Sequence, residues 1–197
     1  MRRYNSQELK QKFKTNGDLI CIDLGCGSRK QKGYIGIDNR KLEGVDIVCD
    51  IEKGLPFEDN TIDRIYANFL FEHINKFIPF MQELYRVCRD GAIVKASFPY
   101  WASMTQWKDP THKQVITIET FRYFSDDKWY GSDYGINTHF KIKNIKYNYL
   151  YTFLARRRYF FLFPLRKFLR RHLINIVHSV WVELEAVKPF GSERIIT

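Results

Sequence analysis

The chain has 197 residues, of which 45% are hydrophobic, so it can fill the core of one domain but is short for two. Its 11 glycines and 6 prolines, without a biased tract, exclude a collagen-like or low-complexity protein. We expect one domain over residues 1–197. We expect no membrane span and no export signal, because no apolar run approaches the roughly 20 residues that a spanning helix needs.

The net charge of +10 is concentrated in one part of the chain. Between Tyr134 and Val182 ten lysines and arginines occur without a single acid, whereas the other 22 basic residues balance the 22 acidic ones. The protein is therefore expected to be a neutral body with one basic element, which argues against a uniformly basic nucleic-acid-binding chain.

The cysteines predict no metal site. They are scattered through apolar segments without a CxxC pair, which favours reduced, buried thiols in a cytoplasmic protein over disulfides or zinc ligands. We therefore expect no bound metal ion. The four are Cys21, Cys26, Cys49 and Cys88.

In chain order, Ser6 is the expected cap of a short helix over residues 7–15, and seven β-rich runs follow it. A helix is predicted from Ile74 to Cys88 by apolar residues at helical spacing, with a cap near Asn75. Asp90 and Gly91 then predict a turn. The expected strands cover residues 19–24, 34–38, 45–50, 62–67, 92–98, 140–153 and 181–187.

Strands alternating with helical segments predict a doubly wound, mostly parallel α/β sheet with a β-rich addition near the end. One connection is unusually short. Only nine residues, Gly25 to Gly33, join the first two strands, whereas a full crossover takes about a dozen. The helix expected there must be reduced to about one turn.

A glycine turn follows the first strand, where Gly25 and Gly27 permit a tight turn and leave the backbone open to a ligand. The phosphate-binding versions of such a turn are not matched. Lys30 stands where a dinucleotide-binding turn has its third glycine, and the GKS or GKT of a P-loop is missing.

Three acids stand at strand ends that a parallel sheet brings to one edge. Asp38 would accept hydrogen bonds from ribose hydroxyls, and Asp50 from an adenine amino group with Ile51 against the ring. Asp23 would sit near a cationic amino-acid moiety. A ligand with ribose, adenine and positive charge, but no phosphate, fits all three. The alternative is that each aspartate only caps a turn or helix.

Four segments resemble the successive motifs of class I S-adenosylmethionine-dependent methyltransferases: ICIDLGCG, YIGID, CDIEKGLPFEDNTIDRIYANFLFEHI and RVCRDGAIV. The later DPTHKQVITIETFRYF and ELEAVKP are similar to segments of small glycan and surface-polysaccharide methyltransferases. The resemblance implies S-adenosylmethionine as cofactor and a seven-stranded sheet whose last strand is antiparallel. It assigns the cofactor to Asp23, Gly25, Gly27, Asp38, Asp50, Ile51 and Asn68.

Two histidines are the candidate catalytic residues. His112 lies in the polar loop after the fifth strand and His73 follows the fourth, at the edge where an acceptor would bind. Either could take a hydroxyl proton, with Glu72 or Asp109 as orienting partner. The alternative is that both are ordinary structural or surface histidines. Aromatic residues that could shape an acceptor pocket border the same loop: Phe98, Tyr100, Trp101 and Trp107.

The basic residues gather in an amphipathic segment at about 154–178. A helix is expected from about Pro164, with Leu165 and Phe168 on its apolar face and Arg166 and Lys167 on its basic face. This composition is typical of an interfacial element that touches an anionic membrane or a lipid-linked acceptor. The alternative is an apolar face that caps the sheet and a basic face in solvent.

These observations predict an S-adenosylmethionine-dependent methyltransferase that acts on a small molecule or glycan, by O-methylation. Its expected location is the cytoplasm, with possible contact to the inner face of the membrane. Two alternatives stay open. The basic segment would also suit an RNA or tRNA methyltransferase, and a catalytically silent cofactor-binding fold could serve as an interaction module.

Overall fold

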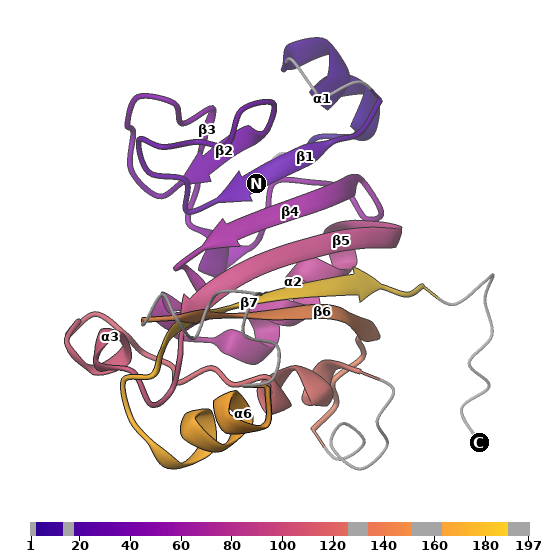
Figure 1. Cartoon of the computed structure of the whole chain (residues 1–197). Coiled ribbons are helices and arrows are strands. Elements are labelled where there is room, and N and C mark those ends of the chain that lie inside the picture. The colour runs from indigo at the N-terminus through magenta and orange to yellow at the C-terminus, as the bar shows by residue number, and fades with distance from the viewer. Residues whose placement is uncertain (1–2, 14–17, 126–133, 151–162, 189–197) are drawn as a thin grey trace, which may run out of the picture.

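The computed structural model describes residues 3–13, 18–125, 134–150 and 163–188. In this part of the chain one seven-stranded sheet has the strand order β3-β2-β1-β4-β5-β7-β6 (Figure 1). The strands are β1 (Cys21–Leu24), β2 (Ile35–Asp38), β3 (Ile47–Val48), β4 (Ile62–Asn68), β5 (Cys88–Pro99), β6 (Phe140–Tyr149) and β7 (Val177–Ala186).

The direction of the strands matches the expectation. The pairs β2–β3, β1–β2, β1–β4 and β4–β5 are parallel, whereas β7 is antiparallel to both β5 and β6. The predicted α/β fold with a mostly parallel sheet and an antiparallel last strand is therefore confirmed. In Figure 1 the arrowheads of β1, β4 and β5 point to the left, so their carboxyl ends form one edge.

The connection between β1 and β2 is one residue longer than predicted, because β2 begins at Ile35, but it is still short for a crossover. Residues 25–34, all of which are described, form turns and contain no helix, so the single expected helical turn is missing. Helices occur elsewhere: α1 (Ser6–Lys12), η1 (Ile51–Lys53), η2 (Phe71–His73), α2 (Phe77–Val87), α3 (Met104–Trp107), η3 (Glu119–Phe124) and α6 (Phe163–His172), where η marks a 3-10 helix.

The helix α2 supplies one side of the core. Its apolar face buries Phe77, Phe80, Met81, Leu84 and Val87, each of which stabilises the fold by about 1.5–3 kcal/mol relative to an exposed position. Rings from η2 and η3 join it, since Phe71 and Phe121 both pack edge-on against Phe77. This packing holds η2, and therefore the residues that follow β4, in a fixed place.

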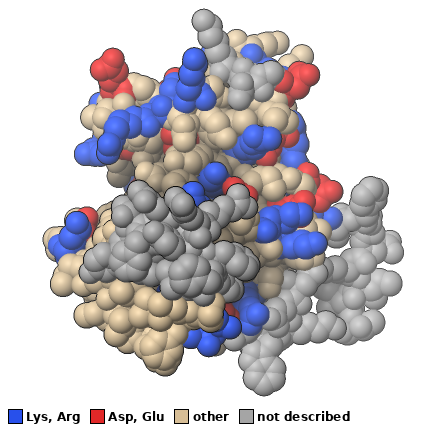
Figure 2. All heavy atoms as spheres, viewed as in Figure 1, with Lys and Arg blue, Asp and Glu red and all other residues tan. Residues whose placement is uncertain are grey.

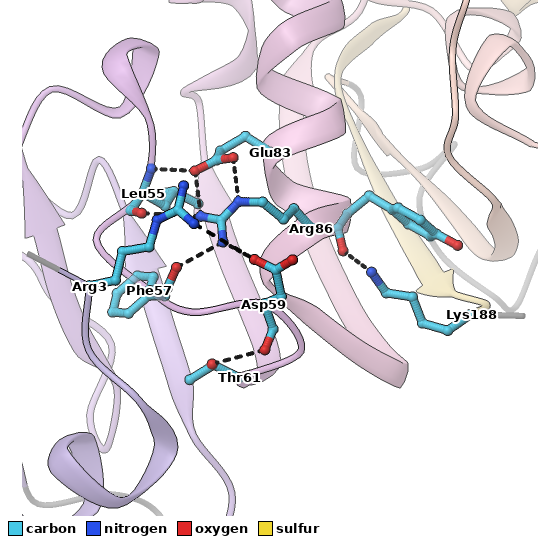
Figure 3. Close-up of polar contacts among 9 residues, drawn as sticks. Arg3, Leu55, Phe57, Asp59, Thr61, Glu83, Arg86 and Lys188 are labelled. Carbon is cyan, nitrogen blue, oxygen red and sulfur yellow. Dashed lines mark hydrogen bonds and ion pairs between the residues drawn. The ribbon is translucent and has the colours of Figure 1, made fainter. Parts of the chain in front are cut away.

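A polar network anchors α2 to the segment before β4 (Figure 3). Arg86 donates two hydrogen bonds of 2.7 Å to the Glu83 carboxylate, one of 2.9 Å to the Phe57 carbonyl and one of 2.6 Å to Asp59. Glu83 in turn accepts the Leu55 N–H at 2.7 Å. Burial alone would raise the pKa of Glu83, but the bonds from Arg86 and Leu55 hold it below the usual value.

Several predicted boundaries were wrong. Asn5, not Ser6, caps α1, through a reciprocal pair of bonds with Glu8. The expected turn at Asp90 and Gly91 lies inside β5, because Gly91 takes a positive φ of 74° where the β4–β5 register shifts, and the strand continues through this irregularity.

The amino-terminal ends of α2 and β7 also differ from the expectation. α2 begins at Phe77 instead of Ile74, and Lys76, next to Asn75, occupies the cap position without a side-chain bond. β7 begins at Val177 instead of Trp181, since Val177, Ser179 and Val180 also pair with β5 or β6. Strand pairing partners far apart in the chain determine such a boundary, and local pattern does not reveal them.

The basic segment is described only in part, because residues 151–162, including Arg156, Arg157 and Arg158, lie outside the described residues. The helix starts where Pro164 predicted, but it ends at His172, and residues 177–178 belong to β7. None of the described helices combines the length and the apolar character needed to cross a bilayer.

The alternative in which the apolar face of α6 caps the sheet does not agree with the exposure of its residues. Leu165 is 42% and Phe168 57% exposed, so the apolar face does not cap the sheet. Arg170 instead lies inward, with its guanidinium 3.9 Å from the centre of the Tyr147 ring, while Tyr100 donates a hydrogen bond to the Arg170 carbonyl. Figure 2 shows an area of uncharged residues (tan) at the lower left of the view, with lysine or arginine (blue) at its edge.

Candidate active site

The carboxyl edge of the parallel strands brings the predicted cofactor residues together. Strand register places Leu24 opposite Ile37 and Ala67, so the residues that follow β1, β2 and β4 meet at one place. The Gly25 N–H donates to the Ile37 carbonyl at 2.8 Å, which closes the glycine turn onto β2. The expectation that separate sequence motifs share one edge is met by this geometry.

The two glycines of the turn serve different purposes. Both have positive φ values, 64° at Gly25 and 53° at Gly27, which L side chains rarely adopt. A Cβ on Gly25 would lie 2.8 Å from Leu70 Cδ1, so that position also lacks room. A Cβ on Gly27 would meet nothing within 4 Å, so the backbone there is open to the cleft.

Asp38 ties the turn to the end of β2. Its carboxylate accepts the Gly27 N–H at 2.9 Å and the Arg40 N–H at 3.0 Å, and it is nearly buried. A carboxylate offers about four acceptor positions, so two remain for another ligand. The proposed role of Asp38 in binding ribose hydroxyls is compatible with these structural bonds.

Asp23 is 2% exposed and accepts the Gln31 N–H at 2.8 Å. Burial raises the pKa of this carboxyl to about 6, against the lowering effects of the Gln31 bond and the nearby Lys30 charge. A buried carboxylate of this kind gains most from a cationic partner. Asp23 thus provides the environment in which a ligand ammonium group would be favoured.

Asp50 has the capping role that the alternative interpretation described, and it also lines the cleft. It accepts the Glu52 N–H at 3.1 Å at the start of η1 and pairs with Lys53 at 3.0 Å. The Lys53 bond lowers the pKa of Asp50. Asn68 accepts the Ser97 hydroxyl at 2.6 Å through its carbonyl oxygen, which directs its amide group away from Ser97.

Two adjoining hollows form the cleft, and they share Gly25 and Arg40. One has a volume of about 600 Å³ and the other about 670 Å³, in the range of small-ligand sites. Every predicted cofactor residue lines one of them: Asp23, Gly25, Gly27 and Asn68 the first, and Gly25, Asp38, Asp50 and Ile51 the second.

The two candidate catalytic histidines lie together at the far side of the second hollow. Their rings are 4.8 Å apart at 74°, and His73 itself lines the hollow. His112 Nδ1 lies 2.7 Å from the Gln106 carbonyl, and His73 Nδ1 lies 3.1 Å from the Thr111 hydroxyl. The hydrogen bonds from Lys113 and Gln114 to the Glu72 carbonyl fasten the histidine loop to η2.

Glu72 and Asp109 differ sharply. Glu72 is completely buried, and neither carboxylate oxygen has a hydrogen-bond partner among the described residues. Burial raises its pKa to about 8, and the Asp109 charge adds to this. Asp109 is exposed, and bonds from the Thr111 hydroxyl and N–H lower its pKa. The Asp109 Oδ2 atom lies 3.8 Å from His112 Nε2.

Sequence reasoning missed three residues of the site. Arg40 lines both hollows and pairs with Asp38, Thr111 contacts His73, and Gln106 holds His112 through its carbonyl. The sequence shows Thr111 next to His112, but the contact of Thr111 with His73, 38 residues away, leaves no local pattern. A backbone carbonyl such as that of Gln106 carries no side-chain signal at all.

The cysteines agree with the expectation of reduced thiols. All four are buried and free. Burial raises the pKa of Cys26 to about 11, so this thiol beside the cleft stays protonated and is a poor nucleophile.

Comparison with known proteins supports the interpretation of the cleft. Residues 5–95, just under half of the chain, match the model of a family described as a methyltransferase domain. This range contains every predicted cofactor residue. No curated protein sequence matches the chain.

Solved structures resemble the chain over nearly its whole length at low identity. An S-adenosylmethionine-dependent methyltransferase from Archaeoglobus fulgidus is 15% identical, with a TM-score of 0.54 over 91% of this chain and 92% of that one. YcgJ from Bacillus subtilis is 13% identical, with a TM-score of 0.57 over 93% and 97%.

A third structure, phosphoethanolamine N-methyltransferase 2 of Haemonchus contortus, was determined in complex with S-adenosyl-L-methionine. It is 15% identical, with a TM-score of 0.50 over 92% of this chain and 51% of that one. At such identities the likeness establishes a shared fold, and the family match over residues 5–95 indicates a methyltransferase domain.

Proposed function

We propose that the chain methylates a hydroxyl group of a small molecule or glycan. The proposal starts from an S-adenosylmethionine-dependent methyltransferase, which the family match and the fold support. The observation that carries the proposal is the pair of imidazoles, His73 and His112, at the end of the cofactor cleft. Methylation of an amine that is already neutral needs no base, whereas a hydroxyl gains from one.

The cleft suits the cofactor on the evidence of its own atoms. The open backbone at Gly27, the spare acceptor positions of Asp38 and the buried carboxylate of Asp23 match a ligand with a diol and an ammonium group. Asp50 and Ile51 would hold the adenine, and the amide of Asn68 would face the methionine side. When bound, the cofactor supplies an electrophilic methyl group on a sulfonium sulfur.

The protein then contributes alignment and proton removal. A histidine nitrogen accepts the proton of the acceptor hydroxyl, the oxygen forms its bond to the methyl carbon, and the sulfur keeps the electron pair of the bond that breaks. The buried η2 and the tethered histidine loop fix the imidazoles relative to the cleft. Fixed placement of this kind is the main contribution an enzyme makes when its cofactor carries the activated carbon.

Exposed aromatic rings near the histidines favour a sugar-like acceptor. Trp107 is 65% exposed and follows Gln106, the residue whose carbonyl holds His112. Its indole N–H donates to the Trp101 carbonyl at 3.1 Å, which positions the exposed ring. Indole faces stack on apolar faces of ligands while the polar edges of those ligands remain free for hydrogen bonds.

The exposed apolar face of α6 supports peripheral contact with an anionic membrane. α6 is joined to the acceptor side, because Tyr100 bonds the Arg170 carbonyl and Asn175 bonds the backbone of Ala102 and Met104. An interfacial helix would bring a lipid-linked acceptor towards the histidines. The four buried free thiols favour a cytoplasmic location, and thus the inner face of the membrane.

Calorimetric titration with S-adenosylhomocysteine tests the cofactor assignment. We expect Asp38→Ala to weaken binding by about 1–3 kcal/mol, because charge-assisted hydrogen bonds to the ligand are lost. Glu58→Ala, which changes an exposed acid elsewhere, is the matched control. Equal affinities of the two variants would remove Asp38 from the ribose site.

A panel of hydroxyl, amine and RNA acceptors tests the substrate class. Methylation confined to hydroxyls of small molecules or glycans supports the proposal. Turnover on RNA with a strong salt dependence would instead favour the RNA methyltransferase, and cofactor binding without turnover on any acceptor would favour the interaction module.

A further inference from the structure

The carboxylate of Glu72 is the least satisfied polar group of the described residues. It is 0% exposed, and both of its oxygens lack a partner, although a buried carboxylate ordinarily is paired, hydrogen-bonded or bound to a metal. The backbone of Glu72 is held in place, because its carbonyl accepts hydrogen bonds from the N–H groups of Lys113 and Gln114 in the histidine loop. Either a proton or a cation must therefore complete its surroundings.

The hydrogen bonds of the two histidines define which ring nitrogen is free. A carbonyl oxygen can only accept, so His112 Nδ1, 2.7 Å from the Gln106 carbonyl, carries a proton. Thr111 donates its single hydroxyl proton to Asp109 at 2.6 Å, so its oxygen accepts from His73 Nδ1 at 3.1 Å. In the neutral rings both protons are on Nδ1, and both Nε2 lone pairs are available.

This arrangement is the one that metal-binding histidines show. Such histidines donate the second ring N–H to a carbonyl or another polar group, which fixes the tautomer and the ring orientation. Here each ring has such a support, one from a backbone carbonyl and one from a hydroxyl held by a carboxylate. Two histidines that were only surface residues would not need matched supports of this kind.

The three side chains converge on one point. One potential ligand atom from each of Glu72, His73 and His112 lies within 4.8 Å of the others. Two ligands that are each about 2.1 Å from one ion lie about 3–4 Å apart, so a modest side-chain movement closes the site. Asp109 Oδ2, 3.8 Å from His112 Nε2, is close enough to supply a fourth ligand.

We propose that Glu72, His73 and His112 bind a divalent transition-metal ion, of which Zn²⁺ is the representative, at the acceptor end of the cofactor cleft. Two imidazoles and one carboxylate form the ligand set of catalytic zinc sites and also suit manganese, iron or cobalt. The proposal departs from the sequence expectation of no metal, which considered only the cysteines. It adds a set in which His112 lies 39 residues after His73 in the chain.

The role of the ion rests on the proposed O-methylation. His73 and Thr111 line the same hollow as Asp38 and Asp50, so the ion would stand where the acceptor hydroxyl is placed. A cation there stabilises the negative charge that develops on the acceptor oxygen, and because both imidazoles are then ligands of the ion, the proton leaves to water instead of to a histidine. The O–H bond and the S–CH3 bond break, the O–CH3 bond forms, and the sulfur retains the electron pair.

Metal titration of the full chain, without cofactor or acceptor, tests the site directly. After dialysis against a chelator, we expect calorimetry with Zn²⁺ and visible absorption with Co²⁺ to show one ion per chain. We expect His112→Ala to lower the affinity at least 100-fold and Thr111→Val, which removes the hydroxyl that supports His73 and bonds Asp109, by about 10–100-fold. His172→Ala, an exposed histidine of α6, is the control and should bind as the wild type does.

Glu72→Gln guards against a misfolded variant, because it keeps the shape of the side chain and removes the unpaired charge. We expect it to fold and to lose the ion. No stoichiometric binding by the wild type, or equal affinity in His112→Ala, would overturn the metal site.

Titration with S-adenosylhomocysteine separates this failure from failure of the proposed function. We expect His112→Ala to bind S-adenosylhomocysteine as the wild type does. Loss of metal binding with retained cofactor binding overturns only the site. Turnover on hydroxyl acceptors that persists after chelation overturns the role of the ion, while a bound ion together with absent methyl transfer overturns the proposed function and leaves the metal site standing.

Discussion

The cofactor side and the acceptor side of the cleft treat their polar groups in opposite ways. Around the glycine turn, Asp23 and Asp38 are buried and bonded to backbone N–H groups of the protein itself. On the other side, Glu72 is buried without a partner, and the rings of Trp107 and Phe168 are exposed. The buried acids of the first region have partners within the protein, whereas the second region has a buried acid without a partner among the described residues.

This difference shows which part of the site follows from the fold and which part does not. The cofactor side falls within the family match at residues 5–95, and its geometry follows from the parallel strands. The acceptor side combines residues on both sides of that limit, such as Glu72 and His112. Its chemistry must be argued from individual atoms, because a shared fold does not determine a substrate.

The largest effect is expected for His112→Ala, which tests whether the acceptor side takes part in the reaction. If the acceptor side performs proton chemistry, its rate of methyl transfer should fall by about 10²–10⁴-fold, with cofactor affinity unchanged. Steady-state kinetics on the true acceptor and calorimetry with S-adenosylhomocysteine measure the two effects. Full turnover in both His112→Ala and His73→Ala would show that positioning alone drives the reaction.

Arg86→Met tests whether the cofactor half depends on its internal bonds. Removing this partly buried cation leaves Glu83 without its partner, and we expect a loss of about 3 kcal/mol in the free energy of unfolding. Denaturant unfolding measures this loss. Arg122→Met, which changes an exposed ion pair with Glu119, is the control and should cost less than about 1 kcal/mol. Similar costs for the two variants would contradict the expectation.

The pH dependence of the free energy of unfolding tests the burial of Asp23 on the cofactor side. Its native pKa of about 6 exceeds the ordinary 3.8, so between about pH 4 and pH 6 the native state keeps a proton that the unfolded chain has lost. Stability from this group therefore falls as pH rises through that window, by about 1–3 kcal/mol. Asp23→Asn, whose amide oxygen can still accept the Gln31 N–H, should lack this fall.

Chemical unfolding of wild type and Asp23→Asn from pH 4 to pH 8 follows the effect. The difference between the two proteins should grow up to about pH 6 and then stay constant. A constant difference over the whole range would show that Asp23 ionises as readily in the native state as in the unfolded chain.

The smallest expected effect concerns the exposed cations of α6. The variant replaces Lys167 and Arg171, because both are exposed, and keeps Arg170, because it packs on Tyr147. Each cation near an anionic bilayer contributes about 1 kcal/mol, so the double serine variant should bind anionic vesicles about 30-fold more weakly at low salt. The control replaces the exposed Lys32 and Lys41, near the opposite edge of the sheet. Vesicle sedimentation that does not distinguish the two variants would argue against docking through α6.

The meeting of the strand ends around the glycine turn was predictable because its signals are local. A strand that ends in an acid, followed by a glycine turn, determines both the conformation and the ligand edge, as Asp23, Gly25 and Asp38 show. The ends of β5 and β7 were not predictable in the same way. A register shift at Gly91 and the pairing of Val177 with Tyr149 depend on strands distant in the chain.

The acceptor side shows the same limit at the level of single atoms. His73 and His112 were recognisable as candidates, but their shared orientation depends on the Gln106 carbonyl and the Thr111 hydroxyl. The exposed apolar face of α6 was also hidden, since helical spacing identifies two faces and does not say which of them the protein covers. Arg170 is attracted to the ring of Tyr147, which a pattern of charges cannot reveal.

The turns at residues 25–34 have a consequence for ligand selectivity. A helix starting there would direct free N–H groups and the positive end of its dipole at the cleft, which is how many nucleotide sites attract phosphate. Without that helix, positive charge at this edge comes from side chains such as Arg29 and Arg40. Dinucleotides and nucleoside triphosphates therefore lose the backbone anion site that they ordinarily use. The cleft can then discriminate against these abundant competitors while still accepting an adenosine without phosphate.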